Sequence, residues 1–400
     1  MLDFLLDRFL PYDAERLWRD ACRRTGLQRA AEPGQMQALS QLLHSYRDEA
    51  RLTKVGRLIA VNDVRRLMRQ SLQMDAERAA NPAIAAQPIQ APIFITGLPR
   101  TGTTLLHGLL AANPRFRAPL TWQVMDPTPA PGLASAAQQR RRIARATKQL
   151  GWFDRLAPGF QAIHEVAAEL PQECIAMLAH SGLSLRFAVT YRVPGYLALL
   201  RQADMRPAYQ WHQHFLQQLQ LGEPVRRWVL KAPAHLHDLA ALLVVYPDAT
   251  IIQTHRDPVD TLPSLASLRV AIRAAFSAQV DAQEAGSEVL SWWADALQRS
   301  LAVREQHGER FIDVDYRQLL ADPEATLAAV YARLDESFTD VERSLCGDYL
   351  AANPQGKHGR HQYRAEDFGF DRSKLEQAFA DYRHSRGFTS SPAANTVRSA

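Results

Sequence analysis

The sequence predicts an α/β fold in which helices flank a parallel β-sheet, with an additional helical layer on the N-terminal side. Short runs of β-branched and aromatic residues recur along the chain, and stretches with helical periodicity separate them. This alternation is typical of a parallel sheet covered by helices. The chain of 400 residues is also longer than one compact core usually contains, so additions to a sheet domain are expected.

The N-terminal helical layer is predicted for residues 1–90. Residues 1 to about 85 carry apolar side chains at spacings of three and four, with arginines on the opposite face. A linker at 79–92 contains several prolines, which end the helices. The first ten residues contain acidic side chains within an apolar run and lack the basic start of a signal peptide, so no export is expected.

The α/β core is predicted for residues 91–345. Its first strand is expected at 93–97 and is followed by a glycine-containing loop and a helix. An insertion at about 128–226 is helical in character, most clearly at 138–153 and 167–180, and is expected to form the substrate side. Later strands are predicted at 227–231, 249–255 and 310–316. Residues 346–400 are expected to form a polar, basic loop and a final helix within 371–388.

Composition limits the class of protein. Hydrophobic residues make up 46% of the chain and charged residues 22%, as in ordinary soluble globular proteins. The net charge of +5 comes from scattered arginines, which suits anionic small molecules and gives no indication of a nucleic-acid partner. Three widely spaced cysteines form neither a disulfide framework nor a zinc site, so a reducing cytoplasm is expected. No apolar stretch is long enough to predict a membrane span.

The loop after the first predicted strand has the features of an anion site. Gly97 and Gly102 permit a tight backbone path, and the following helix offers the positive end of its dipole. Thr103 stands where a Walker-type loop has its lysine, and Arg100 supplies a positive charge nearby. The pattern predicts a P-loop-like, nucleotide-binding site whose anion ligands are Arg100, Thr101, Gly102, Thr103 and Thr104.

The motif PRTGTT at 99–104 resembles the 5′-phosphosulfate loop of the sulfotransferase superfamily. A second motif supports the resemblance, because Arg256 and Ser264 have the eight-residue separation of that family's 3′-phosphate site. Arginine is suited to bidentate binding of phosphate, and the serine hydroxyl can donate from the next helix. The resemblance extends over residues 91–363, and the bacterial branch of the superfamily is the most similar in style.

Three further segments agree with this resemblance. Lys231 and His235 resemble the family's Lys-x-His segment, although they lie two residues further apart here. Tyr316 corresponds to a tyrosine that lies near the adenine in the family. The segment 356–363 resembles the basic loop that closes over the 3′-phosphate, with the site residues Lys357, Gly359 and Arg360.

The resemblance implies a sulfotransferase that moves the sulfuryl group of 3′-phosphoadenosine 5′-phosphosulfate (PAPS) to a hydroxyl of a small-molecule or carbohydrate acceptor. The other product is adenosine 3′,5′-bisphosphate (PAP), and no metal is expected. In this interpretation Arg100 and the loop hold the phosphosulfate, Lys231 stabilises the leaving oxygen, and His235 takes the proton. Glu173 is a second candidate base, because Pro171 could begin a helix that directs it at a cleft.

The sequence also leaves two other functions open, and it departs from the family pattern at two positions. Gln123 stands where many relatives have a glutamate after a tryptophan, so a binder that has lost its catalytic base is one alternative. A kinase with a degenerate loop is another, in which Asp315 would be the acidic magnesium ligand. Leu105 also replaces an aromatic residue that several cytosolic members have after the two threonines.

Overall fold

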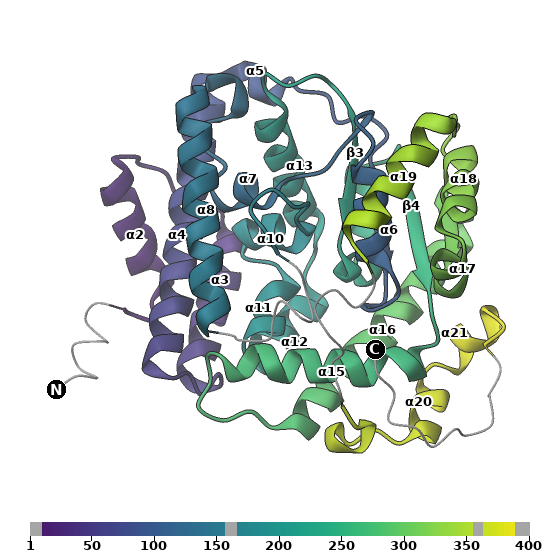
Figure 1. Ribbon diagram of the computed structural model, residues 1–400. Coiled ribbons are helices and arrows are strands. Elements are labelled where there is room, and N and C mark those ends of the chain that lie inside the picture. The colour runs from purple at the N-terminus through teal and green to yellow at the C-terminus, as the bar shows by residue number, and fades with distance from the viewer. Residues whose placement is uncertain (1–9, 157–165, 355–362, 389–400) are drawn as a thin grey trace.

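The computed structural model describes residues 10–156, 166–354 and 363–388. Its centre is a five-stranded sheet with the order β2-β3-β1-β4-β5, in which every neighbouring pair is parallel (Figure 1). The predicted parallel sheet is therefore confirmed. The strands are β1 (Ile93–Gly97), β2 (Phe116–Arg117), β3 (Arg227–Lys231), β4 (Thr250–His255) and β5 (Phe311–Asp315). Only β2 was missed in the sequence, since two residues are too few to form a recognisable apolar run.

The strand register brings the carboxyl ends of four strands, β1, β3, β4 and β5, to one edge of the sheet. Ile95 in β1 is paired with Lys231, the last residue of β3, and Gly97 is paired with Thr254 in β4. The next residue of β4, His255, is paired with Asp315 at the end of β5. Ligands of open parallel sheets bind at the carboxyl ends of the strands, so this edge is where a site is expected.

The predicted N-terminal helices are present. Asp13 and Thr53 cap two of them by accepting hydrogen bonds from backbone amides in the first turn. Buried side chains of this layer, such as Leu42 and Val61, belong to the same apolar cluster as Phe94 in the central strand. The layer therefore shares a core with one face of the sheet. Its helices are α2 (Ala14–Thr25), α3 (Pro33–Asp48), α4 (Lys54–Ala80) and α5 (Pro82–Ala85).

Most of the interval 128–226 is helical as expected, but 167–180 is not one helix. Residues 166–173 are irregular, because their backbone groups bond to residues 119–122: the amide of Trp122 donates to Ala168 O at 2.8 Å, and the amide of Gln172 to Pro119 O at 2.8 Å. The helices before and within the interval are α6 (Thr103–Ala111), α7 (Thr121–Met125), η1 (Pro131–Leu133), α8 (Ala136–Leu156), α10 (Cys174–Leu178), η2 (Ala179–Ser181), α11 (Leu185–Thr190), α12 (Pro194–Gln202) and α13 (Arg206–Gln220).

The remaining helices complete the cover of the sheet. Trp292 and Trp293 are buried and pack their helix, α16, against the core. The final amphipathic segment forms two short helices instead of one, with a break at Phe379. The helices are η3 (Pro233–His237), α14 (Leu239–Val245), α15 (Pro258–Ala274), α16 (Ala282–His307), η4 (Gly308–Arg310), α17 (Tyr316–Ala321), α18 (Pro323–Arg333), α19 (Asp340–Ala352), η5 (Ala365–Phe368), α20 (Arg372–Ala378) and α21 (Ala380–Ser385).

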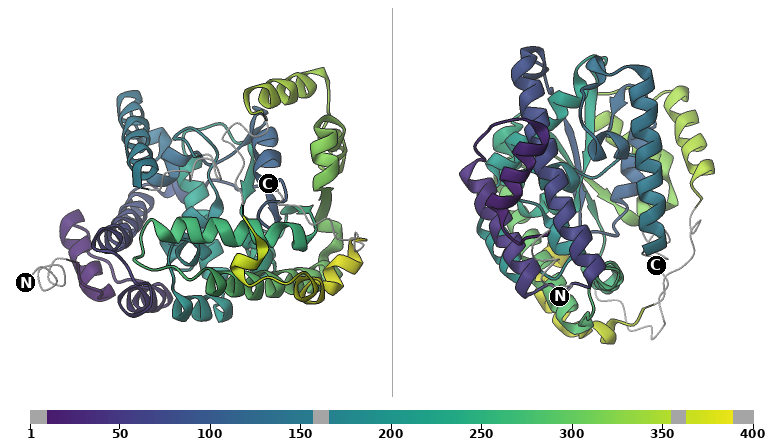
Figure 2. Two further views of the ribbon diagram at one scale, coloured as in Figure 1. Left: turned by 60° about the horizontal axis from the view of Figure 1, so that its bottom comes forward. Right: turned by 90° about the vertical axis from the view of Figure 1, so that its left-hand side faces the viewer.

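The N-terminal and C-terminal parts of the chain lie on opposite sides of the sheet (Figure 1). The N-terminal helices lie at one end, and α18 and α19 lie at the other, beyond the sheet (Figures 1 and 2). None of the described helices combines the length and the apolar character needed to cross a lipid bilayer.

Candidate functional site

The loop between β1 and α6 has the backbone geometry of an anion-binding turn. Gly97, Arg100 and Gly102 have positive φ angles of 141°, 71° and 87°. A Cβ atom on Gly97 would lie 2.4 Å from Thr254 Oγ1, and one on Gly102 would lie 2.9 Å from Leu319 Cδ2. A Cβ on Gly97 would clash with the backbone of β4, and the positive φ of Gly102 would strain any other residue, so glycine suits both positions.

The threonines of the loop have different environments. Thr101 is buried, and its hydroxyl donates to Leu98 O at 2.6 Å and lies 2.6 Å from Thr254 Oγ1. This side chain anchors the loop to β4, so only the Thr101 amide is left to bind an anion. Thr103 and Thr104 open helix α6, where unpaired amides and the helix dipole favour negative charge.

An ion pair lies beside this helix start. Lys231 Nζ is 2.5 Å from Glu173 Oε1 and 3.3 Å from Thr104 Oγ1. The lysine side chain is 3% exposed and the glutamate side chain 16%. Burial, together with the nearby Lys231 charge, lowers the pKa of His107 to about 3, so this neighbour in α6 is neutral.

Glu173 reaches this position without the helix that the sequence predicted. Pro171 lies in an isolated bridge with Leu120, and α10 begins only after Glu173, which is its N-terminal cap residue. Glu169 lies in a turn, so the two glutamates do not share a helical face. The contact of Glu173 with Lys231 thus depends on the pairing with 119–122 and not on helical spacing.

Arg100 and Arg256 converge on the other side of the loop. Arg256 follows the end of β4, and its Nη1 donates to Arg100 O at 3.1 Å. The Arg256 guanidinium lies over the ring of Tyr316, with its central carbon 4.5 Å from the ring centroid. Burial lowers the pKa of Arg100, and the charge of Arg256 acts in the same direction. Ser264 is buried in the second turn of α15, the helix that begins just after Arg256.

His235 does not lie with Lys231. Its side chain is fully buried, Nδ1 is 2.7 Å from the Tyr209 hydroxyl, and the ring packs edge-on against Phe94 with centroids 5.2 Å apart. Nε2 has no hydrogen-bond partner within the described part of the chain. Burial lowers the pKa of His235 well below its usual value, and the charge of His212 contributes. The imidazole is therefore a neutral core group.

Gln123 and Asp315, on which the two alternative functions depend, cap helices. Gln123 Oε1 accepts from the Leu120 amide at 3.0 Å and caps α7. Asp315 caps α17 by accepting from the Arg317 amide at 2.7 Å. Lys357, Gly359 and Arg360 lie outside the described residues. No group of three or more potential metal-ligating side chains occurs among the residues that the structure describes.

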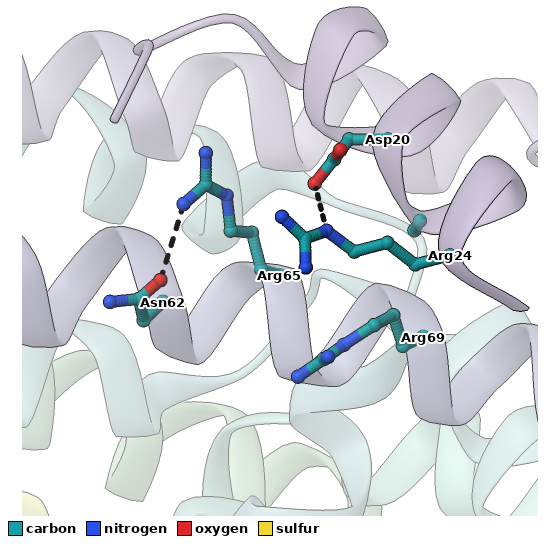
Figure 3. Close-up of a pocket in the computed structure, with 6 residues that line it drawn as sticks. Asp20, Arg24, Asn62, Arg65 and Arg69 are labelled. Atoms are coloured by element: carbon teal, nitrogen blue, oxygen red, sulfur yellow. Dashed lines mark hydrogen bonds and ion pairs between the residues drawn. The ribbon is translucent and has the colours of Figure 1, made fainter. Parts of the chain in front are cut away.

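A small cavity of about 180 Å³ lies elsewhere, between α2 and α4 (Figure 3). It is lined by arginines, but Arg24 Nε is bonded to Asp20 at 2.9 Å and Arg65 Nη1 to Asn62 at 3.3 Å. This cavity belongs to the N-terminal layer and does not adjoin the loop at the edge of the sheet.

Sequence reasoning missed the partners that hold the site together. Thr254, which bonds to Thr101, is a strand residue without a motif of its own. The contact between Glu173 and Lys231 joins residues 58 positions apart. Its neighbours Gln253 and His255 in β4 are polar as well, so the strand sequence did not single out Thr254.

Comparisons with known proteins agree with this geometry. Among crystal structures, sulfotransferase STF1 from Mycobacterium tuberculosis superposes with a TM-score of 0.80 at 29% identity, covering 92% of this chain and 98% of that one. Sulfotransferase STF9 from Mycobacterium avium also gives 0.80, at 26% identity, with 93% and 96% covered. An omega-hydroxy-beta-dihydromenaquinone-9 sulfotransferase of Mycobacterium bovis is 26% identical over 313 residues, 72% of this chain and 77% of the relative. The model of the sulfotransferase family matches residues 92–340, so this chain belongs to the sulfotransferase family.

Proposed function

We propose that the protein transfers the sulfuryl group of PAPS to the hydroxyl of an acceptor in one in-line step. The observation that carries the proposal is the Lys231–Glu173 ion pair, which contacts Thr104 at the start of α6. A cation for the leaving oxygen and a carboxylate for the acceptor proton are thereby adjacent, next to a loop suited to an anion.

The donor is proposed to lie across the β1–α6 loop. The amides of residues 101–104, the hydroxyls of Thr103 and Thr104, and Arg100 hold the 5′-phosphosulfate. Arg256 and Ser264 hold the 3′-phosphate, and Tyr316, whose ring already lies under Arg256, borders the adenosine. Lys357, Gly359 and Arg360 are predicted to close over the 3′-phosphate.

In the reaction, the acceptor oxygen forms a bond to sulfur while the bond from sulfur to the bridging phosphate oxygen breaks. Lys231 stabilises the negative charge on that oxygen, and PAP leaves. As Lys231 turns toward the donor, its hydrogen bond to Glu173 weakens, and the carboxylate becomes available to take the acceptor proton.

Glu173 replaces His235 as the preferred base in this proposal. A general base must come within hydrogen-bond reach of the acceptor hydroxyl, and the fully buried His235 is bonded to Tyr209. The Glu173 side chain is partly exposed and lies beside the lysine. His235 is then a core residue.

The acceptor is proposed to be a hydroxylated small molecule. The similarity to a sulfotransferase of a hydroxylated menaquinone suggests long-chain alcohols on a quinone as the first class to test. Simple carbohydrates, the other predicted acceptors, form the second class to test.

Turnover of sulfur-labelled PAPS with both acceptor classes tests the proposal. We expect transfer of label by the unmodified protein, a severe loss in Glu173→Gln, and normal turnover in Glu169→Gln, an exposed glutamate of the same segment. Tight binding of PAP without transfer to any acceptor would instead indicate a non-catalytic binder. Phosphate transfer from ATP would indicate the kinase alternative.

A further inference from the structure

We propose that Tyr382 and Arg383 of α21 are positioning residues that fix the 3′-phosphate arginine, Arg256. The inference rests on the proposed role of Arg256 in binding the donor. It adds that the selectivity for a 3′-phosphate depends on a helix more than 120 residues later in the sequence, which makes no contact with the donor in this proposal.

The two side chains bond to the side chains of the residues on both sides of Arg256. Tyr382 donates its hydroxyl hydrogen bond to Nδ1 of His255, the residue before Arg256, at 2.8 Å. Arg383 Nε lies 3.2 Å from both carboxylate oxygens of Asp257, the residue after it, and Nη2 lies 3.2 Å from Oδ2. Consecutive residues of α21 thus hold the residues that flank the arginine.

These contacts are buried and therefore strong. His255, Tyr382 and Arg383 are 4%, 3% and 6% exposed. Charged hydrogen bonds in such surroundings are less screened than on a surface. Asp313 accepts the other imidazole hydrogen bond of His255 at 2.7 Å, which assigns the neutral ring a donating Nε2 and an accepting Nδ1. Arg386, the residue that ends α21, pairs with the same Asp313 at 3.0 Å.

Asp257 links α21 to the second proposed phosphate ligand. Its Oδ1 caps α15 by accepting from the Val259 amide at 3.1 Å, so Arg383 also secures the start of the helix that carries Ser264. Both groups assigned to the 3′-phosphate are consequently attached to α21 through Asp257.

The C-terminal helices are themselves fixed to the core. Phe379 and Leu375 are buried, and η5 approaches α16 so closely that a Cβ on Gly286 would lie 2.1 Å from Phe368 O. In Figure 2 these yellow helices lie against the green helices α15 and α16. Because α21 is itself fixed to the core, its contacts with His255 and Asp257 can restrict the position of Arg256.

Arg256 needs to be held in position because it lies beside a second positive charge, that of Arg100. Arg256 lies beside Arg100, and two guanidinium groups repel each other before an anion binds. Because both neighbours of Arg256 are held through their side chains, we expect Arg256 to respond mainly by its own side-chain torsions, which keeps its guanidinium near the proposed phosphate position. Preorganisation of this kind lowers the ordering cost of binding.

The test measures the binding of PAP and of adenosine 5′-monophosphate, which lacks the 3′-phosphate, by calorimetry with the full chain. Arg383→Gln is expected to weaken PAP by roughly 3- to 30-fold, and Tyr382→Phe by a smaller factor, with little effect on the monophosphate. Arg383→Lys, which keeps the charge, should recover part of the loss. Lys374→Gln, an exposed charge change on α20, is the matched control and should bind PAP normally.

A double-mutant cycle separates positioning from a general loss of structure. In the Arg256→Ala background, Arg383→Gln should cause no further loss of PAP affinity, because the group through which it acts is gone. Additive losses, or equal losses with the monophosphate, would overturn the inference. If Arg256→Ala alone left PAP binding unchanged, the proposed role of Arg256 would be wrong. Normal PAP binding by Arg383→Gln beside a weak Arg256→Ala protein would refute only the positioning role.

Discussion

Replacing Glu173 by Gln is the sharpest test of the catalytic assignment. The change keeps the size of the side chain and removes only its negative charge and its capacity to accept a proton. Loss of a general base commonly lowers a rate by about a hundredfold to ten-thousandfold. We therefore expect kcat to fall by about 10² to 10⁴, while PAP affinity stays near normal because Glu173 is not assigned to the donor.

The effect on stability should be much smaller than the effect on rate. Breaking a fully buried pair costs about 3–5 kcal/mol, but Glu173 is partly exposed and Lys231 keeps Thr104 as a partner, so about 1–3 kcal/mol is expected. An unfolding entropy of about 2.1 cal/mol/K per residue gives about 0.8 kcal/mol per degree for 400 residues. The melting temperature should accordingly fall by about 1–4 °C, too little to unfold the protein in an assay at 25 °C.

The assay is label transfer at saturating PAPS, with Glu169→Gln as the control and thermal unfolding measured on the same samples. A Glu173→Gln protein whose kcat stays within threefold of the unmodified value would refute the assignment of the base. A fall in kcat accompanied by a melting temperature lower by more than ten degrees would assign Glu173 a structural role instead.

Three further outcomes are expected. Arg256→Ala should weaken PAP by about 2–4 kcal/mol in calorimetry and adenosine 5′-phosphosulfate, which lacks the 3′-phosphate, far less; equal losses would place Arg256 outside the site. His235→Gln should retain kcat within about threefold despite lower stability, and a loss above a hundredfold would return the base to His235. Between pH 6.5 and 5.5 the free energy of unfolding should fall by about 4 kcal/mol in chemical denaturation, because the unfolded chain takes up protons that four buried imidazoles resist, and a flat profile would contradict this. Burial lowers the folded-state pKa of each of them: His107, His180, His212 and His235.

The sign of that pH effect follows from the direction of the shifts. A histidine whose pKa is lower in the folded chain binds fewer protons there than in the unfolded chain, once the pH is below the unfolded value of about 6.5. The folded pKa of His107, His180 and His212 is lowered to about 3, so their contribution to stability is lost progressively as the pH falls from 6.5 toward that value.

The parts of the fold that were predictable are those with local signals. Strands at 93–97 and 227–231 were expected from apolar runs, and the glycine loop from Gly97 and Gly102, because left-handed backbone requires glycine there. The contact of Arg256 with the loop agrees with its motif, and its role in binding the donor stays a prediction. The prediction of helix across the whole of 167–180 was wrong. The segment has helical periodicity, but the backbone of its first part bonds to residues 119–122. Pairings over such distances leave no trace in a local pattern.

The assignment of His235 illustrates what spacing alone leaves undecided. Successive strand residues point to opposite faces of a sheet, so Val229 and Lys231 share one face of β3 and Leu230 lies on the other. Val229 belongs to the apolar cluster that includes Leu106 and Leu109 of α6, and Lys231 accordingly reaches Thr104 of the same helix.

His235 packs in the apolar cluster on the opposite face of the sheet from Val229. Beyond the strand, Pro233 begins a short 3₁₀ helix, and the histidine packs against Phe94, a member of the opposite cluster. Two extra residues between Lys231 and His235 are enough to carry the chain around the end of the strand. The lysine therefore contacts α6 while the histidine packs against Phe94 and Tyr209, and a carboxylate from another segment, Glu173, lies beside the lysine.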